Sequence, residues 1–483
     1  MASKDLRAWI TKLEKAGELK HVKAKVDWDG EISQILKNVF MQHGPAVLFE
    51  NIKGHENTFS TKLFAGGLAT EARWNIMLGL PRDTHVSETI RTLKNRVRKP
   101  IPPVRVKTGP VKENIIKGKD IDLFQLPVPK WHPLDGGRYI NTFYNAVTKD
   151  LETGTNNVGM YRGPILGKNK IGALLVPMKD WGILYKKYQE MGKPMPVAFV
   201  YGWDPSLLAV AGSPYRGVEY DLAGGIMQKP VELVKCEMSD IEVPASAEIV
   251  VEGTISPDPA TYETEGPFGE GSGFYGEPRK RPVIKVNCIT HRNDPIYRGT
   301  LVGSGATDEL KLLGNISISA SVWEVLDSQE IPGVLDVKVG FPTVVKIHKT
   351  YQGQARQIAA AIWGSKFSGQ VYNMIVVVEE DIDTYNLADI WGAIRDKADF
   401  YKDFIVYPLH MGSPVDANIP IDKRNELEYG AGVQNKLLID ATTDWEVYPV
   451  REEWGKRRTL PKCADQKPEI EKLVKKRWKE YGL

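Results

Sequence analysis

Residues 247–255 read AEIVVEGTI, a short run rich in the β-branched side chains that favour strands. Three similar runs lie nearby, separated by Gly and Pro: GALLVPM (172–178), PVAFVYG (196–202) and PVIKVNCIT (282–290). Short strands with this punctuation are typical of an antiparallel barrel or sandwich. One helical stretch, WGILYKKYQEMG (181–192), interrupts them. Strands with a single inserted helix favour a ligand-holding barrel over a doubly wound sheet.

The last third of the chain has a different pattern. Four apolar runs are predicted strands: GVLDVKVG (333–340), TVVKIHKTY (343–351), MIVVVEEDID (374–383) and DFIVYPL (403–409). Two helical stretches lie between them, QARQIAAAIWGS (354–365) and NLADIWGAIRDKAD (386–399). This alternation predicts an α/β domain with a largely buried sheet.

We therefore predict an α/β (α+β) multidomain protein. The first third mixes helical and strand patterns, and the proline clusters of RKPIPPVRVKTGPV (98–111) indicate an extended linker after it. The expected parts are an N-terminal α/β domain at 1–122, a central β-barrel domain at 123–310, a C-terminal α/β domain at 311–460 and a C-terminal helix at 461–483.

Composition excludes several classes of protein. The 483 residues carry a net charge of +3, which is too small a bias to indicate a nucleic-acid partner. The three cysteines form no CxxC pair, which favours a reducing compartment over a disulfide or zinc scaffold. They are Cys236, Cys288 and Cys463.

The N-terminal stretch predicts an amphipathic helix that ends near Gly17, not a signal peptide. Its expected apolar face consists of Leu6, Trp9, Ile10 and Leu13. No apolar run approaches the length of a membrane span. We therefore expect a cytoplasmic protein without a membrane partner.

An acidic loop, TYETEGPFGEGSGFYGEPRK (261–280), carries the strongest candidates for chemistry. Its glutamates are either ordinary surface charge or a rigid pair, Glu265 and Glu270, of which one is ionised and one transfers a proton. Arg162, in TNNVGMYRGPI (155–165), either pairs with a surface acid or clamps a substrate carboxylate.

Three further residues have two interpretations each. Glu237 lies either on a solvated strand face or, with Asn157, at a divalent metal ion. His132, in KWHPLDGGRYI (130–140), is better interpreted as a turn histidine bonded to backbone than as a catalytic group.

Taken in order, three of these motifs resemble those of the UbiD-type decarboxylases, which use prenylated flavin mononucleotide (prenylated FMN). The motifs are NVGMYR (157–162), VKCEMSDIEVPASAEIVVEG (234–253) and ETEGPFGEGSGFYG (263–276). The resemblance extends over HPLDGGRYI (132–140), MPVAFVYGWDP (195–205), PVIKVNCITHRNDPIY (282–297) and MIVVVEEDIDTYNLADIWGAIRDKAD (374–399), and thus over nearly the whole chain. It implies that the central domain is a flavin-binding split β-barrel and the C-terminal domain an oligomerisation domain.

The resemblance also implies roles for individual residues. Glu265 would hold and polarise Arg162, which orients the substrate carboxylate, and Glu270 would be the proton donor and acceptor. The implied cofactor-binding residues are Asn157, Met160, Tyr161, Arg162, Met178, Lys179, Glu237 and Lys436. Asn157 and Glu237 are the implied ligands of a divalent metal ion such as Mn²⁺, and a K⁺ ion held by backbone carbonyls is a further family feature.

Lys179, in VPMKDW (176–181), departs from the family pattern. It stands where the family has a metal-binding histidine, and a protonated ammonium group cannot coordinate a metal. Either Lys179 replaces the divalent ion as a fixed positive charge, or the ion stays with fewer protein ligands, or the chain holds cofactor poorly. Met178 replaces a glutamine that often contacts the flavin.

The resemblance implies reversible non-oxidative decarboxylation of an aromatic, phenolic or heteroaromatic acid, with carbon dioxide or bicarbonate as the other reactant. A flavin prenyltransferase would supply the cofactor, and a homodimer or homohexamer is expected. Two alternatives stay open: a subunit of a multi-component aromatic carboxylase of the phenylphosphate or arene type, and a flavin-binding protein that does not decarboxylate.

Overall fold

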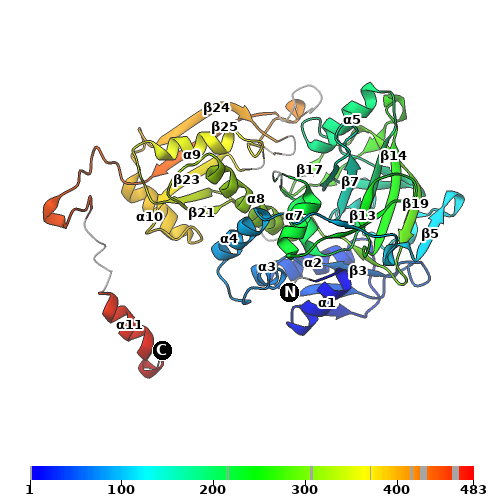
Figure 1. The fold of residues 1–483 in the computed structure, drawn as a ribbon, viewed down its shortest axis with the longest axis horizontal. Helices are drawn as coiled ribbons and strands as arrows, with labels where there is room; N and C mark the ends of the chain where they lie inside the picture. Colours follow the sequence, from blue (N-terminus) through cyan, green and yellow to red (C-terminus); the bar gives the residue numbers. More distant parts are fainter. Residues whose placement is uncertain are drawn as a thin grey trace.

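The computed structural model describes residues 3–213, 215, 217–304, 308–369, 371–413, 416, 418–424, 432–459 and 467–482. The N-terminal elements pack against the central β-sheet, and the C-terminal α/β domain lies on the opposite side of the molecule from the outer strands of that sheet (Figure 1). A tail ending in α11 (Pro468–Arg477) lies apart from the rest in this view. The predicted multidomain α/β class is therefore confirmed.

The predicted central barrel is a curled antiparallel sheet. Nine of the described strands form it, in the order β6-β9-β10-β19-β14-β11-β7-β8 with β5 added beside β19. Their bounds are β5 (Asn114–Lys117), β6 (Tyr139–Asn141), β7 (Asn145–Lys149), β8 (Asn156–Gly159), β9 (Gly163–Gly167), β10 (Lys170–Gly172), β11 (Met195–Tyr201), β14 (Ile249–Ile255) and β19 (Val283–His291). The quoted run 247–255 thus forms β14, which pairs with β11 and β19 at the centre of the sheet.

The prediction of one helix within this domain was wrong. Three helices occur there in the described part of the chain: α5 (Asp180–Glu190), α6 (Pro205–Ala211) and α7 (Glu219–Met227). The sequence pattern did not predict α7 because this helix contains two glycines. Both glycines allow close packing. A Cβ atom at Gly224 would lie 2.4 Å from the carbonyl oxygen of Ile101, and one at Gly225 would lie 2.6 Å from that of Lys99. The proline-rich linker therefore lies directly on α7.

Small sheets border the central one. They are β4 (Val104–Arg105) with β12 (Glu232–Lys235) and β13 (Glu242–Pro244), β15 (Glu263–Glu265) with β18 (Arg279–Arg281), and β16 (Phe268–Gly269) with β17 (Tyr275–Gly276). The last two pairs belong to the acidic loop. Hydrogen-bonded hairpins thus hold this loop, where a solvated turn was the alternative.

The N-terminal domain contains a four-stranded sheet in the order β1-β2-β3-β20. Its elements are α1 (Leu6–Lys15), β1 (Leu19–Val22), α2 (Glu31–Met41), β2 (Ala46–Phe49), β3 (Lys62–Ala65), α3 (Glu71–Leu78), α4 (Val86–Val97) and the distant strand β20 (Ile296–Arg298). Leu6, Trp9, Ile10 and Leu13 are buried in α1 as predicted. The chain thus returns from the central sheet to complete the N-terminal one.

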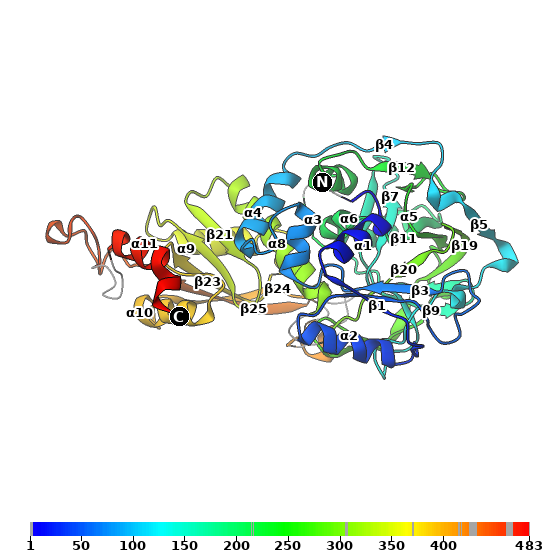
Figure 2. The same cartoon turned by 90° about the horizontal axis from the view of Figure 1, so that it is seen from below.

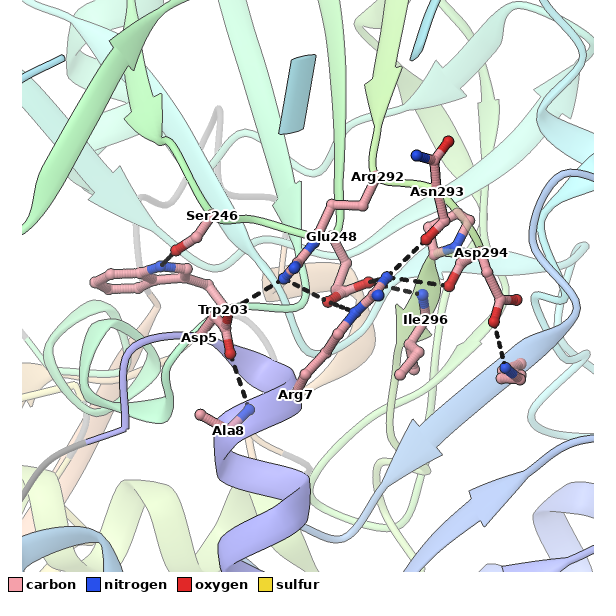
Figure 3. Close-up of polar contacts among 12 residues, drawn as sticks. Asp5, Arg7, Ala8, Trp203, Ser246, Glu248, Arg292, Asn293, Asp294 and Ile296 are labelled. Carbon is pink, nitrogen blue, oxygen red and sulfur yellow. Dashed lines mark hydrogen bonds and ion pairs between the residues drawn. The ribbon is translucent and has the colours of Figure 1, made fainter. Parts of the chain in front are cut away.

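A buried glutamate ties these parts together (Figure 3). The Glu248 side chain is fully buried, and its carboxylate accepts hydrogen bonds from Arg7 Nε at 2.9 Å and Arg292 Nη1 at 3.3 Å. It also accepts the backbone N–H of Ile296 at 3.1 Å. Arg292 continues to Asp5 Oδ2 at 3.1 Å. One charge-paired cluster therefore joins α1, the entry to β14 and the start of β20, and removal of one partner would leave an uncompensated buried charge.

The C-terminal domain has the predicted βαβ alternation. Its sheet order is β21-β22-β23-β25-β24, with parallel pairing among β22, β23 and β25 and antiparallel strands at both edges. The bounds are α8 (Glu309–Ser328), β21 (Val334–Lys338), β22 (Thr343–Ile347), α9 (Gln354–Trp363), β23 (Met374–Glu379), α10 (Leu387–Lys397), β24 (Phe404–Met411) and β25 (Val433–Ala441). Helix α8 lies beside α4 (Figure 2) and also contacts β21 of the C-terminal sheet.

Other sequence-based expectations have mixed outcomes. Cys236 and Cys288 are buried free thiols, whereas Cys463 lies outside the described residues. Within the described part, no helix is both long and apolar enough to cross a membrane. Strand β5 pairs with β19, so residues 114–117, expected in the N-terminal domain, are hydrogen-bonded into the central sheet.

Candidate functional site

Arg162 lies between two glutamates of the acidic loop. It follows β8, and its Nη2 donates to Glu265 Oε2 at 2.7 Å while its Nη1 donates to Glu270 Oε1 in a short contact. Its guanidinium carbon also lies 5.5 Å from the centre of the Phe268 ring. The structure therefore brings Arg162, Glu265 and Glu270 together, although more than 100 residues separate the arginine from the glutamates.

The two glutamates have different surroundings. Glu265 is fully buried at the end of β15, and its Oε1 accepts a hydrogen bond from the Tyr139 hydroxyl at 2.9 Å. Burial raises the pKa of Glu270, and the charges of Glu265 and Asp135 act in the same direction against the opposing effect of Arg162. The pKa of Arg162 is also raised, because the two carboxylates outweigh its burial. Glu270 is thus the carboxyl group better suited to hold a proton.

Hydrogen bonds to Asp135 hold the loop that carries Glu270 in place. Asp135 Oδ1 accepts the N–H of Gly269 at 2.9 Å, and its Oδ2 accepts the N–H of His132 at 3.0 Å. His132 Nε2 donates to the carbonyl of Val302 at 2.6 Å, as expected for a turn histidine bonded to backbone. A Cβ atom at Gly276 would lie 2.6 Å from Arg162 Nη1. Glycine at this position therefore leaves room for the guanidinium group.

A cavity of about 310 Å³ lies beside these three residues. Arg162, Glu270, Met160, Tyr161 and Lys179 line it, together with apolar walls that include Leu174, Phe268, Val302 and Leu310. Among the described residues, two buried donors of this lining have no hydrogen-bond partner, Asn141 Nδ2 and Arg162 Nε. The size and the mixed lining are those of a cofactor or ligand site, and the two orphaned donors call for a polar ligand.

A second group of polar residues lies at the far end of this cavity. Lys179 caps the N-terminus of α5, and Asp180 and Glu219 begin α5 and α7. An adjoining cavity of about 520 Å³ is lined by Asn157, Asp180, Glu219 and Lys366. Burial raises the pKa of Glu219 to about 7. Sequence reasoning missed Glu219; the available signal was the pair of acids, Glu219 and Asp221, just before the apolar stretch LAGGIM (222–227).

Some of the expected site residues lie elsewhere. Glu237 is not brought to the cavity, because its two carboxylate oxygens accept hydrogen bonds from Lys112 and Lys117, each at 3.0 Å. The geometry thus corrects the pairing of Asn157 with Glu237, and Glu219 is the carboxylate that lines a cavity with Asn157. The sequence VKCEMSD resembles a family motif, but its glutamate, Glu237, follows β12 and pairs with Lys117 of β5.

Two further expected cofactor-binding residues do not line the cavity. Met178 is 44% exposed. Lys436 lies on β25, buried within the C-terminal domain, where its Nζ donates to the carbonyl of Ser368 at 3.0 Å. Burial lowers the pKa of Lys436.

The residues present do not fit the expected divalent ion. Asn157 Nδ2 donates to Thr148 Oγ1 at 3.3 Å, and Lys179 supplies an ammonium group in place of a ligand. Within the described chain, no group of three or more His, Cys, Asp or Glu is placed to hold a metal ion. Burial lowers the pKa of Lys179, Asp180 opposes this shift, and the nearby charge of Lys366 adds to it.

A curled β-sheet with an arginine-linked pair of carboxylates beside a large cavity defines the class, a multidomain α/β protein with a buried charged site. Family models match most of the chain. Residues 10–93, 103–305 and 311–441 match the N-terminal, Rift-related and C-terminal domains of 3-octaprenyl-4-hydroxybenzoate carboxy-lyase. The chain belongs to the UbiD family of carboxy-lyases, as its motifs predicted.

Several relatives are similar over nearly their full length. The phenolic acid decarboxylase of Bacillus subtilis is 31% identical over 458 residues, which cover 92% of this chain and 93% of the relative. The closed form of vanillic acid decarboxylase from Sedimentibacter hydroxybenzoicus has a TM-score of 0.86 at 29% identity and covers 100% of this chain and 99% of the other. An evolved dimeric form of HmfF from Pelotomaculum thermopropionicum, in complex with prenylated FMN, has a TM-score of 0.78 at 28% identity, with 97% and 100% covered.

Proposed function

We propose that this protein catalyses the reversible, non-oxidative decarboxylation of an aromatic carboxylic acid with prenylated FMN as its cofactor. The observation that carries the proposal is the buried Arg162, held by Glu265 and Glu270 at the wall of a 310 Å³ cavity. The names of two similar proteins, a phenolic acid and a vanillic acid decarboxylase, support an aromatic acid as substrate.

The cavity fits the proposed cofactor. Asn141 Nδ2 and Arg162 Nε offer donors to its polar groups, and Phe268, Leu174 and Leu310 offer apolar walls to flat rings. Met160 and Tyr161 contribute further lining, and the Lys179 end offers positive charge to a phosphate. When bound, prenylated FMN would supply an electron sink for the pair left on carbon as carbon dioxide departs.

Each residue of the trio has one role in the proposal. Arg162 binds and orients the substrate carboxylate through its positive charge, while its Nη1 and Nη2 donate to Glu270 and Glu265. Glu265, buried and bonded to Tyr139, holds that guanidinium group in place. Glu270 gives a proton to the substrate carbon and later takes one back, which its raised pKa favours at neutral pH. The reverse reaction takes carbon dioxide or bicarbonate.

A second candidate function is that of one subunit in a multi-component aromatic carboxylase or decarboxylase. One structure of the vanillic acid decarboxylase matched above contains a truncated second protein, ShVdcD. A need for such a partner would leave this chain weakly active alone. A flavin prenyltransferase would supply the cofactor under either candidate.

We also propose that two copies associate through the C-terminal domain. Its edge strand β24 exposes Val406 (61%) and Leu409 (81%), and the preceding turn exposes Phe400 and Tyr401. Exposed apolar side chains on an edge strand are a surface that other chains cover. A homodimer, or a hexamer of dimers, is the expected assembly.

The test uses protein produced together with a flavin prenyltransferase. We expect bound prenylated FMN in the native mass spectrum and deuterium exchange into a phenol or arene in D₂O containing bicarbonate. Glu270→Gln should retain the flavin but lose exchange by about 10²-fold or more, because the proton carrier is missing. Glu263→Gln, at a half-buried glutamate of the same loop that pairs with Lys170 instead of Arg162, is the control.

Three outcomes separate the candidates. Exchange in the wild type and not in Glu270→Gln supports the proposal and identifies the substrate class. Bound flavin without exchange favours the subunit function. Undiminished exchange in Glu270→Gln contradicts the role given to this residue.

A further inference from the structure

A second, smaller cavity of about 40 Å³ adjoins the first. Arg162, Leu174 and Glu270 line both cavities, so the two meet at the proposed catalytic arginine. The remaining lining comes from the hairpins of the acidic loop and from Arg424, which follows a short helical turn of the C-terminal region (Ile421–Lys423). Strand β17 lies on the side of the central domain that faces the C-terminal domain (Figure 1).

Arginine dominates this lining. Arg279 and Arg281 are two residues apart on β18, so they project from the same face of the strand. With Arg162 and Arg424, they bring four guanidinium groups to a cavity that two carboxylates, Glu270 and Glu277, also line. Among the described lining residues, positive groups therefore outnumber negative ones.

Burying these arginine charges in the cavity costs free energy. Arg281 is only 7% exposed, and burial lowers its pKa to about 10; the nearby carboxylate of Glu265 opposes this shift, and the positive charges of Arg162 and Arg279 add to it. A surface arginine that serves solubility does not incur this penalty. Glu277, which pairs with Arg279 at 3.3 Å, is exposed to solvent and offsets little of the positive potential inside.

The dimensions limit what this cavity can hold. A volume of about 40 Å³ exceeds the roughly 10–15 Å³ that one water molecule needs, so the cavity has room for a small polar group. Guanidinium groups bind planar oxyanions through paired hydrogen bonds.

We propose that this cavity is a subsite for a carboxylate-class oxyanion, next to the reacting carboxylate. The inference rests on the proposed function and extends it to the substrate. The oxyanion is either a second acidic group on the aromatic ring or bicarbonate used in the carboxylation direction. Both share a planar, negatively charged carboxylate-like group.

The experiment uses cofactor-loaded protein and ¹³C-formate as the probe. Its dissociation constant is measured from ¹³C line widths for the wild type, Arg281→Met and Arg424→Met. We expect both variants to bind formate at least about tenfold more weakly, because each loses a charged hydrogen-bond donor. Lys280→Met, on the exposed opposite face of β18, should bind as the wild type does. If Arg281→Met does not fold because Arg281 is buried, Arg424→Met still tests the subsite.

Competition identifies the source of the oxyanion. Displacement of formate by benzene-1,3-dicarboxylate at least about tenfold more effectively than by benzoate assigns the subsite to a second ring carboxylate. Displacement by bicarbonate alone assigns it to bicarbonate. Displacement by neither, unchanged formate binding in both arginine variants, or no saturable binding in the wild type overturns the proposal. Deuterium exchange on the same samples tests the proposed function separately.

Discussion

At the scale of single residues, Lys179 is the expected departure from the family pattern. A nitrogen that carries a proton repels a metal ion, so the residue converts a coordination position into a fixed charge. Its place before α5, beside Asp180 and on the cavity that Glu219 also lines, explains how one substitution changes the chemistry of that end. Asn157 and Glu219 still offer oxygen atoms there.

We predict that Lys179→His increases the divalent metal content of the purified protein. An imidazole would complete a set with the oxygen atoms of Asn157 and Glu219, so binding should rise toward about one Mn²⁺ per chain. Elemental analysis after dialysis measures this. Lys193→His, an exposed position beyond the same helix, is the control. Equal metal content in all three proteins would falsify the idea that Lys179 takes the place of the ion.

The site residues show which spatial contacts can be predicted from the sequence and which cannot. The grouping of Arg162 with Glu265 and Glu270 was expected from a family resemblance, because spacing alone does not join positions more than 100 residues apart. The same resemblance suggested Glu237, but this residue pairs with Lys112 and Lys117 and does not line the cavity. Glu219 was missed because the helix that presents it was missed.

At the scale of elements, strands with clear apolar, β-branched patterns were predicted. Helices that lack an apolar stripe along one face were not. The runs that form β22 and β23 are β-branched and buried on both faces. Helix α8 is the counterexample, since it contacts α4 on one side and β21 and α9 on the other. Apolar residues are therefore needed around its whole circumference, and no periodic stripe marks it.

A loop contact between the N-terminal and central domains predicts a pH effect. His55, 3% exposed after β2, accepts a hydrogen bond from Arg138 Nη2 at 3.0 Å, which requires a neutral ring. Burial, with the charge of Arg138, lowers its pKa from 6.5 to about 4. The unfolded chain thus binds the proton more readily than the folded one, and stability falls as pH drops from about 6.5 to 4, by up to about 3 kcal/mol.

We predict that His55→Gln removes this part of the acid sensitivity, since an amide oxygen can accept the same hydrogen bond without titrating. The melting temperatures of variant and wild type are compared from pH 8 to pH 4. The variant's loss of stability on acidification should be smaller than that of the wild type only below about pH 6.5. His348→Gln, an exposed histidine, is the control. Parallel curves for variant and wild type would contradict the assignment.

At the scale of the whole molecule, the apolar edge of the C-terminal domain predicts the assembly. We expect light scattering to give a mass near twice 54.1 kDa or a multiple of it. Leu409→Lys should weaken association by more than about tenfold, because it places a charge on the edge strand. Leu134→Lys, at a leucine of the central domain that is 65% exposed, should change nothing. A monomeric wild type would rule out this interface.

The return of the chain to the N-terminal sheet has a consequence during protein synthesis. Strand β3 ends at Ala65, but its outer neighbour β20 begins only at Ile296. At about 5–20 residues per second, a ribosome needs roughly 10–45 s to make the sequence between them. Throughout that interval β3 has an unpaired edge, so the nascent chain is a client for chaperones, and the first domain is finished only after the second has been translated.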